Sequence, residues 1–147
     1  MVDFNILTSK NADSLDQYRE FLSACTESDL TTPMSAGWTV SAVLVHLAFW
    51  DQRALTLLDK WEKDGISFSA IDTDVVNEIT RHLCLAIPPK AAVDLFLNTA
   101  KTLDDRIAKM TPETMANIEE NGKNVHLNRA AHREIHMKDI KTALRRS

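Results

Sequence analysis

The part of the sequence that decides the fold lies near the C-terminus and reads Ala131-His132-Arg133-Glu134-Ile135-His136. It belongs to a segment, residues 123–147, that contains no Gly or Pro and is therefore predicted to be helical. Side chains four residues apart on a helix are separated by about 40° of rotation, with Cβ atoms roughly 6 Å apart. The two imidazoles of this stretch can therefore point at one metal ion.

A third imidazole lies far upstream, on a helix predicted at about residues 40–63. Thr39 is a favourable N-cap for this helix, and Gly65 is a typical residue to end it. Its apolar stripe steps by three and four through Val43, Leu47, Trp50, Ala54, Leu57 and Trp61. Because His46 lies beside this stripe, we expect its side chain to face the core.

Three further long helices are predicted at residues 9–26, 89–110 and 124–145. The first two of these repeat apolar residues at spacings of three and four, which indicates one buried face on each. Ser9 or Asp13 is the expected N-cap of the first.

Shorter elements are predicted between the long helices. Residues 66–90 form a long connection with a short helix that begins after Asp72 or Thr73, and residues 111–121 form another short helix. No strand pattern and no repeat is present. The sequence therefore predicts an all-α protein: a single domain, residues 1–147, folded as an antiparallel four-helix bundle with a long crossover between the second and third long helices.

Charge is spread unevenly along the chain, which has a net charge of −4. Residues 123–147 carry seven cations against Glu134 and Asp139, a net charge of +5, which leaves −9 for the rest. The cations are Lys123, Arg129, Arg133, Lys138, Lys141, Arg145 and Arg146. We expect a solvated helix face whose cations favour the helix C-terminus. No nucleic-acid interface is predicted, because no aromatic residues alternate with these cations.

The two cysteines indicate the cellular compartment. Cys25 and Cys84 are far apart and form no Cys-x-x-Cys motif, so both are expected to be buried, reduced thiols on helical apolar stripes. No signal peptide is recognisable at the N-terminus, and no apolar run approaches the ~18 residues that span a membrane. A cytoplasmic protein without a membrane contact is predicted.

The three histidines can be interpreted separately or together. A single histidine on an apolar helix face, such as His46, is most often a core imidazole hydrogen-bonded to a carbonyl oxygen. A His-x-x-x-His pair by itself is weak evidence for a metal site. Burying three ring nitrogens together without an acceptor costs free energy, and a metal such as Zn, Ni, Cu or Fe removes that cost. Three protein ligands leave one position open, which is typical of catalytic rather than structural zinc.

Other polar residues near this stretch have different expected roles. Asp139 returns to the helix face of His132 and His136, where it is a candidate second-shell acceptor or fourth ligand. Asn128, one turn before His132, is a similar candidate. Glu134 points about 200° away from His132 and is expected to be solvated. The remaining histidines, His82 and His126, are interpreted as surface or cap residues.

These motifs resemble those of the DinB/YfiT-like superfamily. The resemblance rests on a Trp-Thr-Val helix start followed by His-Leu, residues 37–47, and on the His-x-x-x-His of the last helix. The order of elements agrees over nearly the whole chain. The resemblance implies a four-helix bundle, often dimeric, in which His46, His132 and His136 hold a divalent metal.

The superfamily includes mycothiol-dependent maleylpyruvate isomerase, thiol S-transferases that use bacillithiol, and stress-associated members. The resemblance therefore implies a metal-dependent thiol S-transferase, isomerase or hydrolase, with Zn, Ni or Fe, a low-molecular-weight thiol and a homodimer. The alternative is a non-catalytic stress-response or ligand-binding bundle. Many relatives have Arg after the second His, where this chain has Met137 and Lys138, so substrate contacts are not carried over. No general base is identified.

Overall fold

A computed structural model describes residues 2–123 and 125–146. Within these residues the regular secondary structure is entirely helical, and the only β-type pairing is an isolated bridge between Pro33 and Thr39. The helices are α1 (Phe4–Ser23), α2 (Glu27–Leu30), α3 (Val40–Asp64), α4 (Thr73–Leu85), α5 (Pro89–Ala108), α6 (Pro112–Asn121) and α7 (Arg129–Ala143), with a 3-10 turn, η1, at Ser35–Gly37. The prediction of an all-α protein is confirmed.

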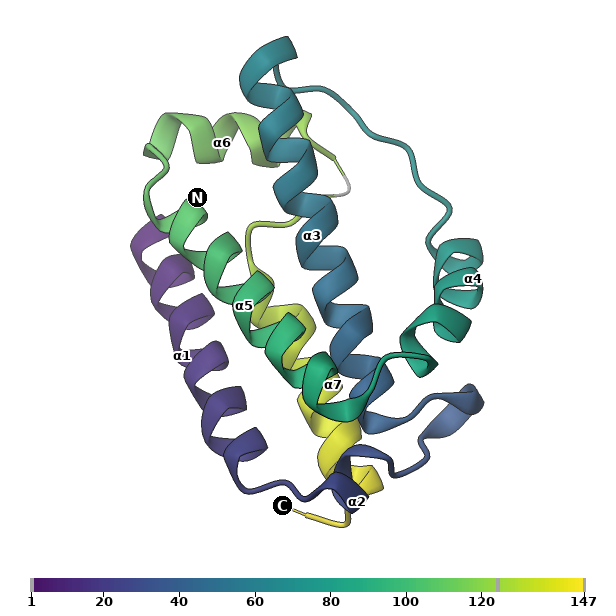
Figure 1. Cartoon of the computed structure of the whole chain (residues 1–147). Helices are drawn as coiled ribbons and strands as arrows, with labels where there is room; N and C mark the ends of the chain where they lie inside the picture. Colours follow the sequence, from purple (N-terminus) through teal and green to yellow (C-terminus); the bar gives the residue numbers. More distant parts are fainter. Residues whose placement is uncertain (1, 124, 147) are drawn as a thin grey trace.

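Four long helices, α1, α3, α5 and α7, lie alongside one another and enclose the core (Figure 1). α3 packs on α5 and α7, and α1 packs on the same two helices. Two clusters of buried apolar residues fill the interior, the first including Leu15, Leu44, Phe96 and Ile140 and the second including Leu58, Trp61, Leu103 and Leu127. The last helix is thus held on two sides by the helices that precede it.

The predicted ends of α3 are confirmed. The Thr39 hydroxyl accepts a hydrogen bond from the backbone N–H of Ala42 at 3.2 Å, as an N-cap does. The helix ends at Gly65, whose φ of +88° is a backbone conformation that glycine adopts readily and that is strained for residues with a side chain. These two local signals mark where α3 begins and where it ends.

The crossover after α3 contains a short helix, as predicted, and this helix is α4. Asp72 caps it. Hydrogen bonds hold the crossover against α3. Trp50 Nε1 donates to Asn77 Oδ1 at 3.0 Å, and Arg53 Nη2 donates to Ser69 Oγ at 3.1 Å and to the Ser69 carbonyl oxygen at 3.2 Å. Because of these contacts, α4 and the chain before it form a wall beside α3 (Figure 1).

The predicted start of the first helix is wrong. α1 begins at Phe4, because the carboxylate of Asp3 accepts hydrogen bonds from two first-turn N–H groups at 3.0 and 3.2 Å. Ser9 and Asp13 therefore lie inside the helix rather than at its cap. The helix also ends three residues earlier than predicted, at Ser23.

The predicted start of the last helix is also wrong. α7 begins at Arg129, five residues after the predicted position, which lies outside the described residues. Asn128 is its N-cap and accepts a hydrogen bond from the N–H of Ala131 at 3.2 Å. Residues 125–128 form a connection without regular secondary structure, so the absence of Gly and Pro did not make this segment helical.

The cysteines agree only in part with the prediction. Cys84 is buried in α4, but Cys25 lies beyond the end of α1 and is half-buried. Both are free thiols.

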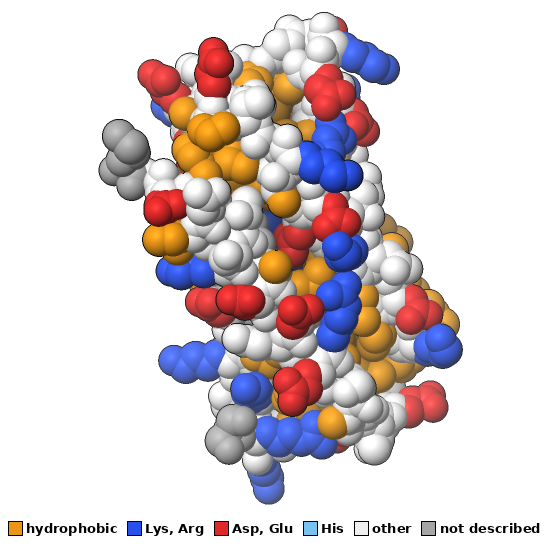
Figure 2. Space-filling view, turned by 90° about the vertical axis from the view of Figure 1, so that its left-hand side faces the viewer, with side chains coloured by type: hydrophobic (Ala, Val, Ile, Leu, Met, Phe, Trp, Pro, Cys, Tyr) orange, Lys and Arg blue, Asp and Glu red, His pale blue; other side chains and the backbone are white. Residues whose placement is uncertain are grey.

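The face of the molecule on the α1 side carries acidic and basic side chains with apolar patches between them (Figure 2). No imidazole is visible on this face. None of the helices within the described residues is long and apolar enough to cross a membrane.

Candidate metal centre

His46 lies in the buried half of α3, with a side chain that is 8% exposed. It is flanked by Val43 and Leu47, which are buried in the same core cluster. The ring of Trp38 contacts it edge-on, with 5.4 Å between the ring centroids. The inward orientation predicted from the spacing of the apolar residues is therefore confirmed.

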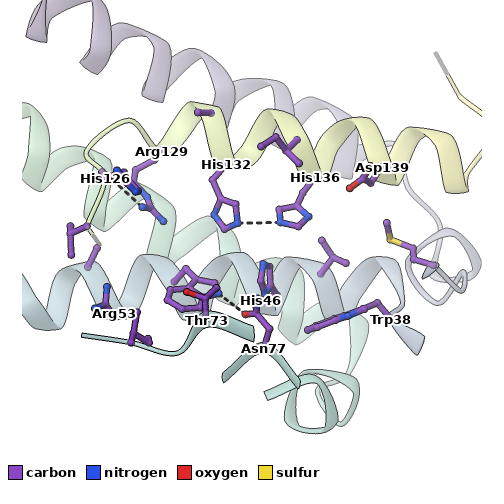
Figure 3. A pocket seen from close by; sticks show the side chains of 18 of the residues that line it. Trp38, His46, Arg53, Thr73, Asn77, His126, Arg129, His132, His136 and Asp139 are labelled. Carbon is purple, nitrogen blue, oxygen red and sulfur yellow. Dashed lines mark hydrogen bonds between the residues drawn. The ribbon is translucent and has the colours of Figure 1, made fainter. Parts of the chain in front are cut away.

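His132 and His136 project from successive turns of α7 toward His46 (Figure 3). Their Nε2 atoms are 3.1 Å apart. The ring centroid of His46 lies 5.4 Å from that of His132 and 4.9 Å from that of His136. The structure thus brings together two imidazoles that are one helical turn apart on α7 and a third, that of His46, which lies 86 or more residues earlier in the sequence.

The geometry of these three residues fits a divalent cation. Each offers one ring nitrogen, and the three atoms lie within 4.8 Å of one another. Nitrogens bound to one ion at about 2.1 Å would lie roughly 3.4 Å apart in a tetrahedral site, so small side-chain rotations are sufficient. In addition, His46 Nδ1 is buried and has no hydrogen-bond partner among the described residues. A buried atom of this kind in a pocket indicates a partner that the polypeptide does not supply.

The electrostatics of the site keep all three imidazoles neutral near pH 7. Burial, with the nearby His136, lowers the pKa of His46 to about 4. Burial, with His136 and Arg129, lowers the pKa of His132 to about 3. Burial also lowers the pKa of His136, although the carboxylate of Asp139 acts in the opposite direction. Neutral imidazole is the form that binds metal, so protons compete weakly for these nitrogens.

The imidazoles form part of the wall of a pocket of about 630 Å³ between α3, α4 and α7. Its apolar lining includes Trp38, Trp50, Ile71 and Ile135, and its polar lining includes Arg53, Thr73, Asn77, His126 and Asp139. A volume of this size is typical of sites for small organic molecules. The three imidazoles are therefore open to a ligand that enters this pocket.

The other predicted polar residues are distributed as follows. Asp139 is exposed and lines the same pocket, one turn after His136 (Figure 3). The side chain of Asn128 is used as the N-cap of α7, so its candidacy as a ligand is not supported. Glu134 and His82 are exposed, as predicted. His126 is exposed too, but it also lines the pocket, which the sequence did not indicate.

A buried ionic network lies next to the imidazoles on α7. Arg129 Nε donates to Asp51 Oδ1 at 2.9 Å. Arg133, only 1% exposed, forms a bidentate pair with Asp104, with both N–O distances at 2.8 Å. The expectation that the cations of residues 123–147 form a solvated face is therefore wrong for these two arginines.

Uncharged groups complete the attachment of α7. Asn11 Oδ1 accepts hydrogen bonds from the backbone N–H groups of Arg129 and Ala130 at 2.8 and 3.0 Å. The Tyr18 hydroxyl donates to the carbonyl oxygen of Arg133 at 2.7 Å. Since α1, α3 and α5 all bind α7 through these groups, the rotation of α7 about its axis is fixed. This rotation turns His132 and His136 toward His46.

The sequence contains one signal for this network. Asp51 falls between Leu47 and Ala54 on the buried stripe of α3, and Asp104 follows Leu103 on that of α5. A carboxylate on a core stripe normally has a cationic partner. The partners themselves are 78 and 29 residues away, so only the fold identifies them.

The family model of the mycothiol maleylpyruvate isomerase N-terminal domain matches residues 12–120, more than half of the chain. The chain belongs to this family. The family is part of the DinB/YfiT-like superfamily, which confirms the resemblance found from the motifs. The matched range includes His46 but ends before the two histidines of α7. No curated protein and no solved structure gives a significant match.

Proposed function

We propose that this chain is a metal-dependent enzyme in which His46, His132 and His136 hold one divalent cation: Zn, Ni or Fe. The observation that carries this proposal is the convergence of three neutral imidazoles in the wall of a pocket large enough for a small molecule. Three protein ligands leave a position open for a substrate. A cation held there would lower the pKa of a thiol or water that occupies this position.

The reaction class that we propose first is transfer or isomerisation with a low-molecular-weight thiol, and metal-assisted hydrolysis is the second. The family name supports the first, since it refers to mycothiol and maleylpyruvate isomerase. The pocket supports both, because its apolar walls can bind a carbon skeleton beside polar groups.

Asp139 is the candidate proton acceptor in this scheme. It is the acidic residue that lines the pocket, and its charge already acts on His136. A carboxylate positioned in the pocket can take a proton from a thiol or water that binds beside it. Trp38 and Trp50 would orient the substrate by packing against its apolar part.

A non-catalytic ligand-binding or stress-response protein is the competing proposal. The two differ in whether an accessible pocket with an acid or base adjoins the metal. The described residues provide such a pocket and place Asp139 in it, which supports the enzyme.

The test is a screen of purified, metal-loaded protein with low-molecular-weight thiols and electrophiles. We expect turnover that needs the metal, that His46→Ala abolishes, and that His126→Ala largely retains, because His126 lines the pocket outside the three-histidine cluster. Asp139→Asn should lower kcat more than it raises KM. If the loaded protein binds thiols but no metal-dependent turnover is found with any of them, the ligand-binding alternative is correct.

We also infer that the four long helices form an antiparallel bundle and that residues 1–147 are one domain. The packing of α1 and α3 against both α5 and α7 supports the bundle. Free thiols at Cys25 and Cys84 support a reducing compartment such as the cytoplasm. A homodimer, implied by the superfamily resemblance, is part of the same proposal.

A further inference from the structure

α4 carries an apolar stripe that faces solvent. Val75, Ile79 and Leu83 follow one another at spacings of four and are 46%, 61% and 65% exposed. Residues at this spacing lie on one face of a helix, so the three side chains form a continuous strip. Soluble monomers rarely leave aliphatic groups of this kind gathered in one place.

The opposite side of α4 is the one that packs on the protein, and it is mainly polar or small. Asn77 on this side receives the hydrogen bond of Trp50, and Thr80 is half-buried. Cys84 is the only residue of α4 that is fully buried. The amphipathic pattern of α4 is thus inverted relative to the other helices, which indicates a partner on its outer face.

Charge along α4 identifies a partner that matches. Its N-terminal half carries acidic groups, Asp74 and Glu78, after the acidic cap Asp72, whereas its C-terminal half carries Arg81 and His82. Two such helices side by side in parallel would place like charges together. In the antiparallel direction, acidic groups of one helix lie beside basic groups of the other, and the helix dipoles are also opposed favourably.

We propose that the outer face of α4 is a homodimer interface, in which two copies of this helix pack antiparallel across a two-fold axis near Ile79 and Thr80. A two-fold axis makes one self-complementary patch sufficient, and this patch is apolar in the centre with opposite charges at its ends. Glu78 of each copy then lies near His82 of the other. The proposal names the surface that the homodimer of the preceding subsection would use, and it is independent of the metal chemistry.

The size of this surface limits its strength. A 13-residue helix is about 20 Å long, and one face of it is smaller than the ~800 Å² per partner of a standard interface. We therefore expect a dimer that is in reversible, concentration-dependent equilibrium with the monomer. The other side of α4 lines the metal pocket through Thr73 and Asn77, so the dimer would also hold this wall in place.

Sedimentation velocity over a range of protein concentrations tests the interface. We expect a reversible monomer–dimer equilibrium for the wild type and a dissociation constant about tenfold or more higher for Ile79→Glu. Leu95→Glu on α5 is the matched control: it is 42% exposed and lies outside α4, so dimerisation should be unchanged. Circular dichroism of both variants checks that they are folded. A wild type that stays monomeric, or equal effects of the two variants, overturns the proposal.

Charge reversal distinguishes a second copy from a different protein partner. His82→Glu should weaken the dimer, because it places two carboxylates beside each other across the two-fold axis. Adding Glu78→Lys to this variant removes the repulsion. The double variant restores opposite charges and should dimerise at least as tightly as the wild type. Failure of this rescue, with Ile79→Glu still disruptive, overturns the antiparallel arrangement. None of these positions lines the metal pocket, so metal binding measured in parallel stays unaffected if only the interface is changed.

Discussion

Two neighbouring faces of α7 each carry a pair of nitrogen-containing side chains, but the surroundings of the two pairs differ. On one face, Arg129 and Arg133 are four residues apart, buried, and bonded to carboxylates of α3 and α5. On the neighbouring face, His132 and His136 are four residues apart, and their ring nitrogens lie close to each other and to the imidazole of His46 on α3. The first face is closed by groups of the protein, whereas the second opens into a pocket.

This difference indicates that the arginine–carboxylate cluster serves the fold and that the three-histidine cluster is a candidate functional site. A buried arginine without a carboxylate would be very costly, so Asp51 and Asp104 are required for the fold. Neutral imidazoles cost much less to bury, which allows the protein to leave their nitrogens for a ligand from outside. The arginine face holds α7 in place, and the histidine face uses the resulting orientation.

The largest effect is expected on the arginine face. Asp104→Asn removes the charge that balances Arg133 and should lower the free energy of unfolding by about 3 kcal/mol, because a buried cation is left uncompensated. The matched control is Asp105→Asn, the next residue, whose carboxylate pairs with Lys101 on the surface. The control should lose less than about 0.5 kcal/mol. Urea unfolding in excess chelator measures both, and similar losses would mean that the buried network does not hold α7.

Substitutions on the histidine face should have their largest effect when metal is present. Metal at about 100 times its dissociation constant should stabilise the wild type by roughly 2.7 kcal/mol, because it binds only the folded state. His132→Ala should lose most of this gain, whereas His126→Ala, which removes a pocket imidazole outside the cluster, should keep it. Thermal unfolding with metal and with chelator gives the comparison. An equal metal effect in all three proteins would place the ion elsewhere.

A smaller effect concerns pH in the metal-free protein. Folding lowers the pKa of all three imidazoles below their usual value of about 6.5, so the unfolded state binds more protons as the pH falls below that value. Stability should therefore be complete above about pH 6.5 and decrease on acidification, by roughly 1–2 kcal/mol in total at pH 5.5 once partial exposure is allowed for.

Chemical unfolding at several pH values in excess chelator follows this loss. His132→Gln, which has one titrating ring fewer, should show a shallower slope. A slope as steep as that of the wild type would mean that His132 is not held neutral by the fold.

The smallest effect is expected at Asp139. Because this carboxylate is exposed and only adjoins the imidazoles, Asp139→Asn should leave the unfolding free energy within about 0.5 kcal/mol of the wild type. Metal affinity should fall about tenfold, as for other groups that support ligands without binding the ion. Competition with a chromogenic chelator measures the affinity. A loss as large as that of His136→Ala would make Asp139 a direct ligand.

Elements with local signals were predictable from the sequence. Thr39 and Gly65 fix the ends of α3, and the apolar stripe between them places His46 in the core. The spacing of His132 and His136 on a helix was sufficient to bring their nitrogens together.

Elements fixed by distant contacts were not predictable. α7 begins at Arg129, where its local cap Asn128 is joined by Asn11, more than 100 residues away, which accepts hydrogen bonds from the first N–H groups of the helix. The burial of Arg133 likewise depends on Asp104, which sits on a different helix. Periodicity reports which residues share a face, but it does not identify the charged group that faces them from another element.

The central claim is that His46, His132 and His136 hold one divalent ion, and X-ray absorption of metal-loaded protein tests it most directly. We predict one ion per chain with nitrogen or oxygen ligands at about 2.0–2.1 Å and the scattering pattern of imidazole rings. The variant with all three histidines changed to Ala should bind no ion. Sulfur ligands at about 2.3 Å, or full occupancy in the triple variant, would contradict the account.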